Sequence, residues 1–98
     1  MITLINLVKE GNLIKTNYFS ESNSDDLGYI EYDIVKNEVI RYTYSREDSE
    51  SVIKFDFHHA IRAIERLIEY NTYPKEYYYI WYWCQNLRLD IHFMMQFN

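Results

Sequence analysis

Cysteine, glycine and proline are scarce in this 98-residue chain, which contains one, two and one of them respectively. The single cysteine, Cys84, excludes an internal disulfide, so nothing in the sequence supports secretion into an oxidising compartment. Because glycine and proline are scarce, asparagine, aspartate and serine must make most of the turns. Because Gly11 and Gly28 lie far apart, the common glycine-rich phosphate-binding loops are excluded.

Long apolar segments and basic clusters are also missing. The longest uninterrupted apolar run covers residues 77–84, which is far too short for a membrane span. The N-terminal segment lacks the basic start, apolar stretch and cleavage site of a signal peptide. The formal net charge of −5 disfavours binding to nucleic-acid phosphates or anionic lipids. We therefore expect a cytoplasmic protein with no nucleic-acid and no membrane partner.

Hydrophobic and aromatic residues are abundant instead. They make up 48% and 18% of the chain, and there are 11 tyrosines. This composition is typical of a globular protein and far from the signature of disorder. The length fits one domain with one hydrophobic core, so we assign residues 1–98 to a single domain.

Alternating apolar residues predict a first hairpin from residues 2–9 and 13–20. Gly11 and the asparagine that follows it suit a two-residue turn that needs positive φ. With that turn, Ile5 lies opposite Tyr18. Both faces of the hairpin are partly apolar, which favours a position inside a sheet.

A second hairpin is predicted from residues 29–35 and 39–44. A three-residue loop at 36–38 keeps the apolar residues of both strands on one face. This register places Asp33 beside Arg41.

The pattern then changes from a period of two to a helical period. Residues 53–57 alternate and predict a short fifth strand. An amphipathic helix follows, for which Asp56 is the expected N-cap, with Asn71 and Pro74 marking its end. Its apolar stripe consists of Phe57, Ala60, Ile61, Ile64, Leu67 and Ile68, whereas His59, Arg62, Glu65, Arg66 and Glu69 fall on the other side.

The C-terminal part is strand-like. Residues 77–84 are rich in aromatic rings, and residues 87–97 alternate cleanly, with a turn expected at 85–86. A helix over residues 74–84 is the alternative. The sequence thus predicts an α+β fold, an antiparallel sheet of about six or seven strands built from hairpins, with one amphipathic helix packed on one face.

No catalytic or metal-binding set emerges from the reactive side chains. Residues four beyond His58 and His59 are Arg62 and Ala63, so neither histidine has a metal-ligating neighbour on its helix face. A metal site would have to recruit distant groups such as His92. We expect one of the adjacent imidazoles to be packed and the other solvated, and we predict no metal and no cofactor.

Two further reactive features have simple structural interpretations. Cys84 ends an apolar run, where a free cysteine usually behaves as a small buried hydrophobe. Glu31 and Asp33 share one strand face and could divide acid and base chemistry, but the flanking sequence shows no pocket that would separate their pKa values. We predict no catalytic residues and a non-enzymatic protein.

Charge is distributed unevenly along the chain. Residues 20–50 contain nine acidic and three basic residues, a net charge of −6, which leaves +1 for the remainder. Such an acidic segment either solvates one face of the sheet or steers a basic partner toward it.

The aromatic strand is the most informative feature for function. If residues 77–83 are extended, four rings project from one side: Tyr77, Tyr79, Trp81 and Trp83. Rings that can both pack and form hydrogen bonds are enriched at interfaces. The hypothesis is a protein–protein interaction module or a homodimer that uses this aromatic sheet surface. The alternative is a small metal-dependent or ligand-binding protein with a site around His58, His59 and His92.

Overall fold

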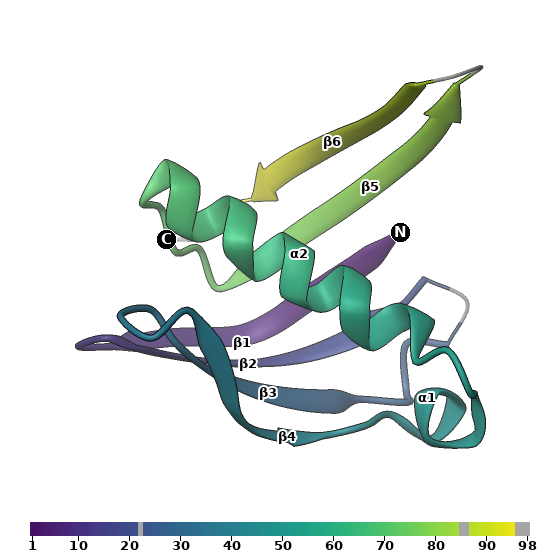
Figure 1. Ribbon diagram of the computed structural model, residues 1–98, viewed down its shortest axis with the longest axis horizontal. Coiled ribbons are helices and arrows are strands. Elements are labelled where there is room, and N and C mark those ends of the chain that lie inside the picture. The colour runs from purple at the N-terminus through teal and green to yellow at the C-terminus, as the bar shows by residue number, and fades with distance from the viewer. Residues whose placement is uncertain (22, 85–86, 96–98) are drawn as a thin grey trace.

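The protein is an α+β structure in which one antiparallel sheet carries a helix on one face (Figure 1). The computed structural model describes residues 1–21, 23–84 and 87–95, with side chains up to residue 80. This architecture confirms the predicted fold class. The predicted turn at residues 85–86 lies outside the described residues.

The strands follow the order β4-β3-β2-β1-β5-β6, and every neighbouring pair is antiparallel. The C-terminal aromatic segment forms a strand and not a helix, as the ring content favoured. The strand bounds are β1 Ile2–Glu10, β2 Leu13–Ser20, β3 Gly28–Asp33, β4 Glu38–Thr43, β5 Glu76–Cys84 and β6 Leu87–Met95.

Two helices lie between β4 and β5 in the chain. The first, α1, is a short helix over Arg46–Glu50, and the second, α2, spans Phe55–Tyr70. The predicted short strand at residues 53–57 is wrong, because α2 begins inside it. The sheet of the described residues therefore consists of β1 to β6 and lacks the additional strand that was expected before the helix. Alternation over five residues was too short a pattern to distinguish a strand from the first turn of a helix.

A β-bulge in β1 corrects the register predicted for the first hairpin. Asn6 has a φ of 56°, and at this point two residues of β1 oppose one of β2. The extra residue shifts the pairing, so Tyr18 lies opposite Leu4 and not opposite Ile5. The bulge also turns both Leu4 and Leu7 toward the core although they are three residues apart.

The second hairpin also differs from its predicted register. Asp33 lies opposite Glu38, and Arg41 lies opposite Glu31. The reason is that β3 ends at Asp33, whose carboxylate accepts the backbone N–H of Lys36 at 3.0 Å and starts the turn early. A second bulge, in which Ile40 is the extra residue of β4, reduces the difference from the predicted register, so that Glu31 pairs with Arg41 and not with Ile40.

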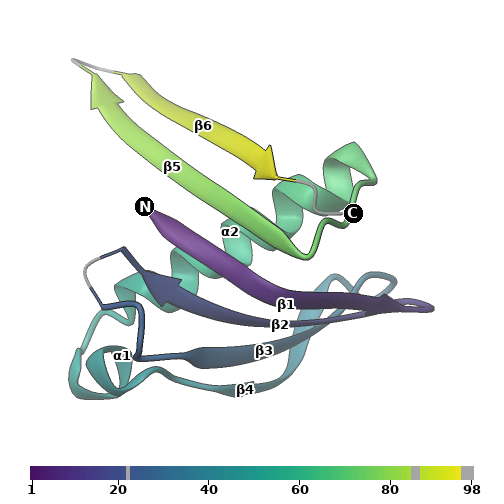
Figure 2. The same ribbon diagram turned by 180° about the vertical axis from the view of Figure 1, so that it is seen from behind.

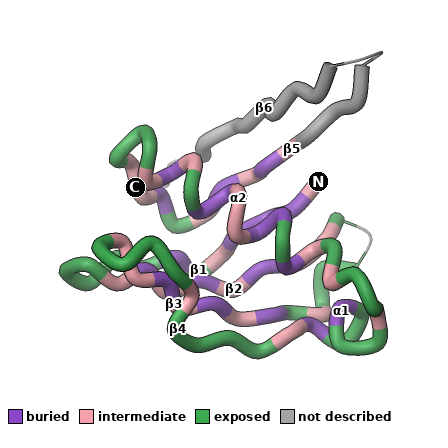
Figure 3. Tube along the Cα trace, viewed as in Figure 1, coloured by how far each residue is buried: buried purple, intermediate pink, exposed green. Residues whose placement is uncertain are grey.

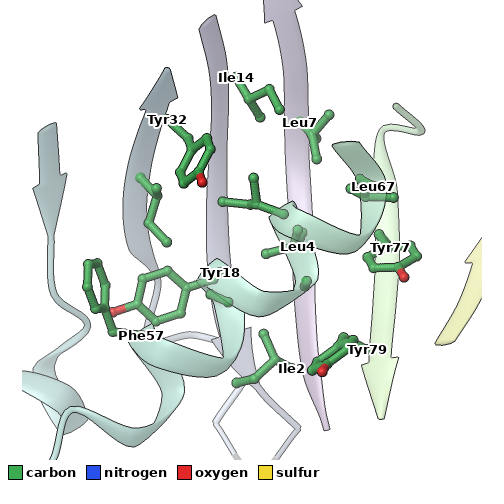
Figure 4. Close-up of a cluster of buried hydrophobic side chains, with 14 residues drawn as sticks. Ile2, Leu4, Leu7, Ile14, Tyr18, Tyr32, Phe57, Leu67, Tyr77 and Tyr79 are labelled. Atoms are coloured by element: carbon green, nitrogen blue, oxygen red, sulfur yellow. The ribbon is translucent and has the colours of Figure 1, made fainter. Parts of the chain in front are cut away.

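The core lies between α2 and the sheet (Figure 4). The predicted apolar stripe of α2 is confirmed, since four of its six residues are buried and Ile61 and Ile68 pack against the cluster. Ala60 and Ala63 bring the helix close to the strands because their side chains are small. The buried hydrophobic residues are Ile2, Leu4, Leu7, Ile14, Tyr18, Ile30, Tyr32, Phe57, Ala60, Ala63, Ile64, Leu67, Tyr77 and Tyr79.

Tyr18 crosses its neighbouring strand over a glycine. Gly28 lies opposite Tyr18 on β3, and a Cβ at position 28 would overlap the Tyr18 ring. The absence of a side chain therefore lets this ring reach the N-terminal end of α2, where it packs edge-on to Phe57 at 6.2 Å between ring centroids.

The ends of α2 differ in how well the sequence predicted them. Asn71 ends the helix in the left-handed conformation, with a φ of 53°, as predicted. The predicted N-cap, Asp56, is wrong: Lys54 occupies that position, with a φ of 55° and no side-chain capping bond. Asp56 lies inside the first turn instead.

The face of the sheet away from α2 is open in the part of the chain that the structure describes (Figure 2). Half-buried rings lie on it, including Phe19 and Tyr78, which flank the buried Thr3 from either side. Among the described residues, no helix has the length and apolar character needed to cross a membrane.

Candidate interaction surface

The predicted aromatic surface is divided between the core and residues whose side chains are not described. Tyr77 and Tyr79 are fully buried and point under α2 (Figure 4). Arg62 Nε donates a hydrogen bond to the Tyr79 hydroxyl at 3.3 Å, and burial raises the pKa of Tyr77. These two rings stabilise the fold and do not form a docking surface.

The other two predicted site residues are Trp81 and Trp83. Their side chains lie outside the described residues, so the expectation that they contribute to an interface stays a prediction. The backbone shows one relevant fact: β5 pairs with β1 only at residues 77–79, whereas its pairing with β6 covers residues 76–84. The tryptophans thus belong to the part of β5 that extends beyond β1.

The adjacent histidines point in different directions. His58 is exposed, whereas His59 is buried, with its ring 4.4 Å from that of Phe55 and 6.5 Å from that of Tyr79. One packed and one solvated imidazole is what the sequence predicted, although it had placed His59 on the polar side of the helix. The side chain of His92 lies outside the described residues. No cluster of three potential metal ligands occurs among the residues that are described.

The acidic pair on β3 forms ordinary structural contacts. Glu31 accepts a hydrogen bond from the Tyr29 hydroxyl at 2.8 Å and lies opposite Arg41. Asp33 starts the turn described above. The two carboxylates thus serve the hairpin and do not converge on a common site.

Two small surface depressions are lined mainly by charged side chains. One of about 270 Å³ lies along α2 between Arg62, Glu65, Arg66 and Glu69. Another, of about 240 Å³, lies between Asn23, Asp25, Asp26 and Arg46. Neither has the largely apolar lining typical of small-molecule sites.

The connection between α1 and α2 exposes a group of apolar side chains that sequence reasoning missed. Val52 is 97% exposed, Ile53 67% and Phe55 48%. We call these three residues the apolar corner. Val52 and Ile53 belong to the connection and Phe55 is the first residue of α2. The connection lies at one end of the sheet, beside α1 (Figures 1 and 3). The alternation of Ile53 with Phe55 and Phe57 had suggested a strand, and this interpretation concealed the exposed position of Val52.

The backbone on the N-terminal side of the apolar corner is fixed by side-chain caps. Ser45 Oγ accepts the N–H of Asp48 at 3.2 Å, as an N-cap of α1. The carboxylate of Asp26, which lies on the loop after β2, accepts the N–H groups of Arg46 and Glu47 at 2.7 and 2.9 Å. Two separate side chains thus satisfy the first turn of this five-residue helix.

Asp48 joins α1 to both the sheet and α2. Its carboxylate is buried and accepts a hydrogen bond from the Tyr18 hydroxyl at 2.8 Å and another from the N–H of Asp56 at 3.2 Å. The Tyr18 oxygen in turn accepts the N–H of Ser45 at 3.2 Å. Burial, together with Asp48, raises the pKa of Tyr18, so the phenol remains a donor.

Lys54 fixes the connection from the other side. Its Nζ donates to the carbonyls of Ser49 and Ser51 at 3.3 and 2.5 Å and lies 5.1 Å from the centre of the Tyr44 ring. The N–H of Ile53 donates to Ser51 Oγ at 3.2 Å. The residues around Val52 are therefore held by polar contacts, while the apolar side chains themselves remain in solvent.

The surroundings of the apolar corner are acidic. The two segments that meet there, residues 25–26 and 46–56, carry six carboxyl groups and two cationic side chains: Asp25, Asp26, Glu47, Asp48, Glu50 and Asp56 against Arg46 and Lys54. The pKa of Asp56 is raised to about 6, first by burial and then by the charges of Asp48, Glu47 and Asp26. The neighbouring carboxylates thus add to the effect of burial on Asp56.

Comparison with family models, with curated proteins and with solved structures found no match for this chain.

Proposed function

We propose that the protein is a non-enzymatic interaction module that docks onto another protein through the apolar corner. The observation that carries this proposal is the exposure of Val52 and Ile53, at 97% and 67%. Contiguous exposed apolar side chains mark interaction surfaces more often than isolated ones do. Burying these two side chains would contribute roughly 3 kcal/mol by transfer from water alone.

Anchoring of the backbone strengthens the proposal. Docking is weakened when a loop must become ordered at the moment of binding. Here the contacts of Asp48 and Lys54 already hold the connection on both sides of Val52. The apolar corner therefore presents its side chains with little further loss of backbone entropy.

This proposal modifies the hypothesis drawn from the sequence. It keeps the class of function, a protein-binding module, and moves the surface from the rings of Tyr77 and Tyr79 to the α1–α2 connection. Trp81 and Trp83 remain predicted contributors to an interface on β5.

Site-specific photocrosslinking in cells that produce the protein tests the proposal. A photoreactive aliphatic amino acid is placed at position 52 and, as a matched control, at position 35. Val35 is also a strongly exposed valine, at 72%, but it lies in the loop between β3 and β4. We expect an adduct of defined mass from position 52 that is absent from position 35.

The adduct should disappear when Ile53→Asp is added, because a charge placed in the contact cannot be buried unpaired. The variant itself should fold, since Ile53 is exposed. Identical adducts from both positions, or an adduct from position 52 that survives Ile53→Asp, would contradict docking through the apolar corner.

A further inference from the structure

The charge around the apolar corner indicates what kind of partner it accepts. On the basis of the proposed function, we propose that the partner presents an apolar patch flanked by lysine or arginine side chains. Glu47 and Glu50 are exposed on α1 and precede Val52 closely in the chain. They would lie at the rim of the contact, where opposite charges speed association and determine which partner binds.

The same charges disfavour a second copy of this chain as the occupant. In a two-fold symmetric dimer the same patch meets itself. Two apolar corners facing each other would bring the carboxylates of both copies together, which costs free energy because like charges repel across a desolvated interface. A monomer is therefore expected when the solution mass is measured by light scattering over a concentration series, and a dimer lost in Val52→Ser would overturn the inference.

The cations on these segments do not neutralise the rim. Lys54 is committed to the carbonyls of Ser49 and Ser51 and to the Tyr44 ring. Arg46 is exposed on α1 but faces a larger number of carboxylates on the same segments. An approaching partner therefore meets more exposed carboxylates than exposed cations on these segments.

Two amphipathic helical peptides test the inference. Both carry leucine along one face; one has lysine at all other positions, and the matched peptide has glutamate. Binding to the full chain is measured by fluorescence anisotropy, and the contact is located from the methyl NMR signals of Val52 and Ile53. We expect the lysine peptide to bind about tenfold more tightly, and its affinity to fall as salt is raised.

Matched variants separate the contribution of charge from that of apolar contact. Glu47→Gln with Glu50→Gln should weaken binding of the lysine peptide, whereas Glu38→Gln, an exposed glutamate at the start of β4, should not. Val52→Ser should weaken binding of the lysine peptide, and Val35→Ser should leave it unchanged.

The outcomes distinguish the inference from the proposed function. Equal affinity of the two peptides, or no effect of the paired glutamine substitutions, overturns the basic partner while shifts at Val52 and Ile53 still support docking at the apolar corner. Peptide binding that leaves both methyl signals unchanged overturns the docking surface itself.

Discussion

The two ends of α2 show two ways of completing a helix. At the C-terminal end the chain supplies its own termination: Asn71 adopts the left-handed conformation, and its N–H and that of Thr72 donate to the carbonyls of Ile68 and Leu67 at 3.1 and 3.2 Å. At the N-terminal end Lys54 offers no side-chain cap. There the N–H of Asp56 donates to Asp48, a residue of another helix.

This difference couples the N-terminal end of α2 to the rest of the fold. Asp48 also accepts from Tyr18 on β2, whose ring is positioned over Gly28 on β3. A change on β3 can therefore reach the helix end that carries the apolar corner. The C-terminal end has no such dependence, since its capping bonds are made within six residues.

Substitution of Gly28 gives the largest predicted effect. A Cβ in Gly28→Ala would overlap the Tyr18 ring and displace its hydroxyl from Asp48. Overpacking and the loss of a hydrogen bond to a charged group together should lower the free energy of unfolding by about 4 kcal/mol. Urea denaturation measures this change.

A double-mutant cycle isolates the cause. In a Tyr18→Leu background, which removes the clashing part of the ring, Gly28→Ala should have little further effect. If Gly28→Ala is equally destabilising in both backgrounds, the link between β3 and the helix end is not carried by Tyr18.

Removal of the Asp48 carboxylate should affect one end of α2 and not the other. Asp48→Ala leaves the partly buried N–H of Asp56 and the buried Tyr18 hydroxyl without their acceptor, which should cost about 3 kcal/mol. Asp48→Asn retains one acceptor oxygen and should cost less. Hydrogen exchange should show loss of protection in the first turn of α2 and unchanged protection near Asn71; equal losses at both ends would contradict the coupling.

The sequence predicted the end of α2 that is completed locally and failed at the end that is not. Asparagine itself favours the left-handed conformation, so its presence at position 71 predicts where the helix ends. Asp48 caps α2 only because the fold brings its carboxylate next to the N–H of Asp56, eight residues later in the chain. No local pattern contains that information.

The same distinction applies to the strands and to the candidate site. Hairpin pairings were predictable because hydrophobic alternation identifies the buried face. The predicted registers of the two hairpins were wrong for local reasons. Asn6, in the left-handed conformation, marks an extra residue in β1, and the turn after β3 begins early at Asp33. The apolar corner could not be predicted, since exposed and buried isoleucines look the same in a sequence.

Substitution at the C-terminal end should have a modest effect that depends only on the backbone. Asn71→Ala places a Cβ in the left-handed region without the favourable asparagine side chain, and should lower the free energy of unfolding by about 1 kcal/mol. Asn71→Gly should be neutral or stabilising, because glycine adopts this conformation readily. If both substitutions destabilise equally, side-chain contacts of Asn71 and not its conformation complete the helix.

The smallest effect is expected at Asp56 and depends on pH. The folded-state pKa is raised to about 6 from 3.8, so the folded protein holds this proton more tightly than the unfolded chain does. The ionised carboxylate is therefore unfavourable above about pH 6, and this penalty vanishes below about pH 4. Because the side chain is only half-buried and solvent screens part of these charges, Asp56→Asn should raise stability near neutral pH by less than about 1 kcal/mol and by nothing at low pH. A loss of stability near neutral pH would instead mean that attraction of the carboxylate to the positive end of the α2 dipole outweighs its repulsion by Asp48 and Glu47.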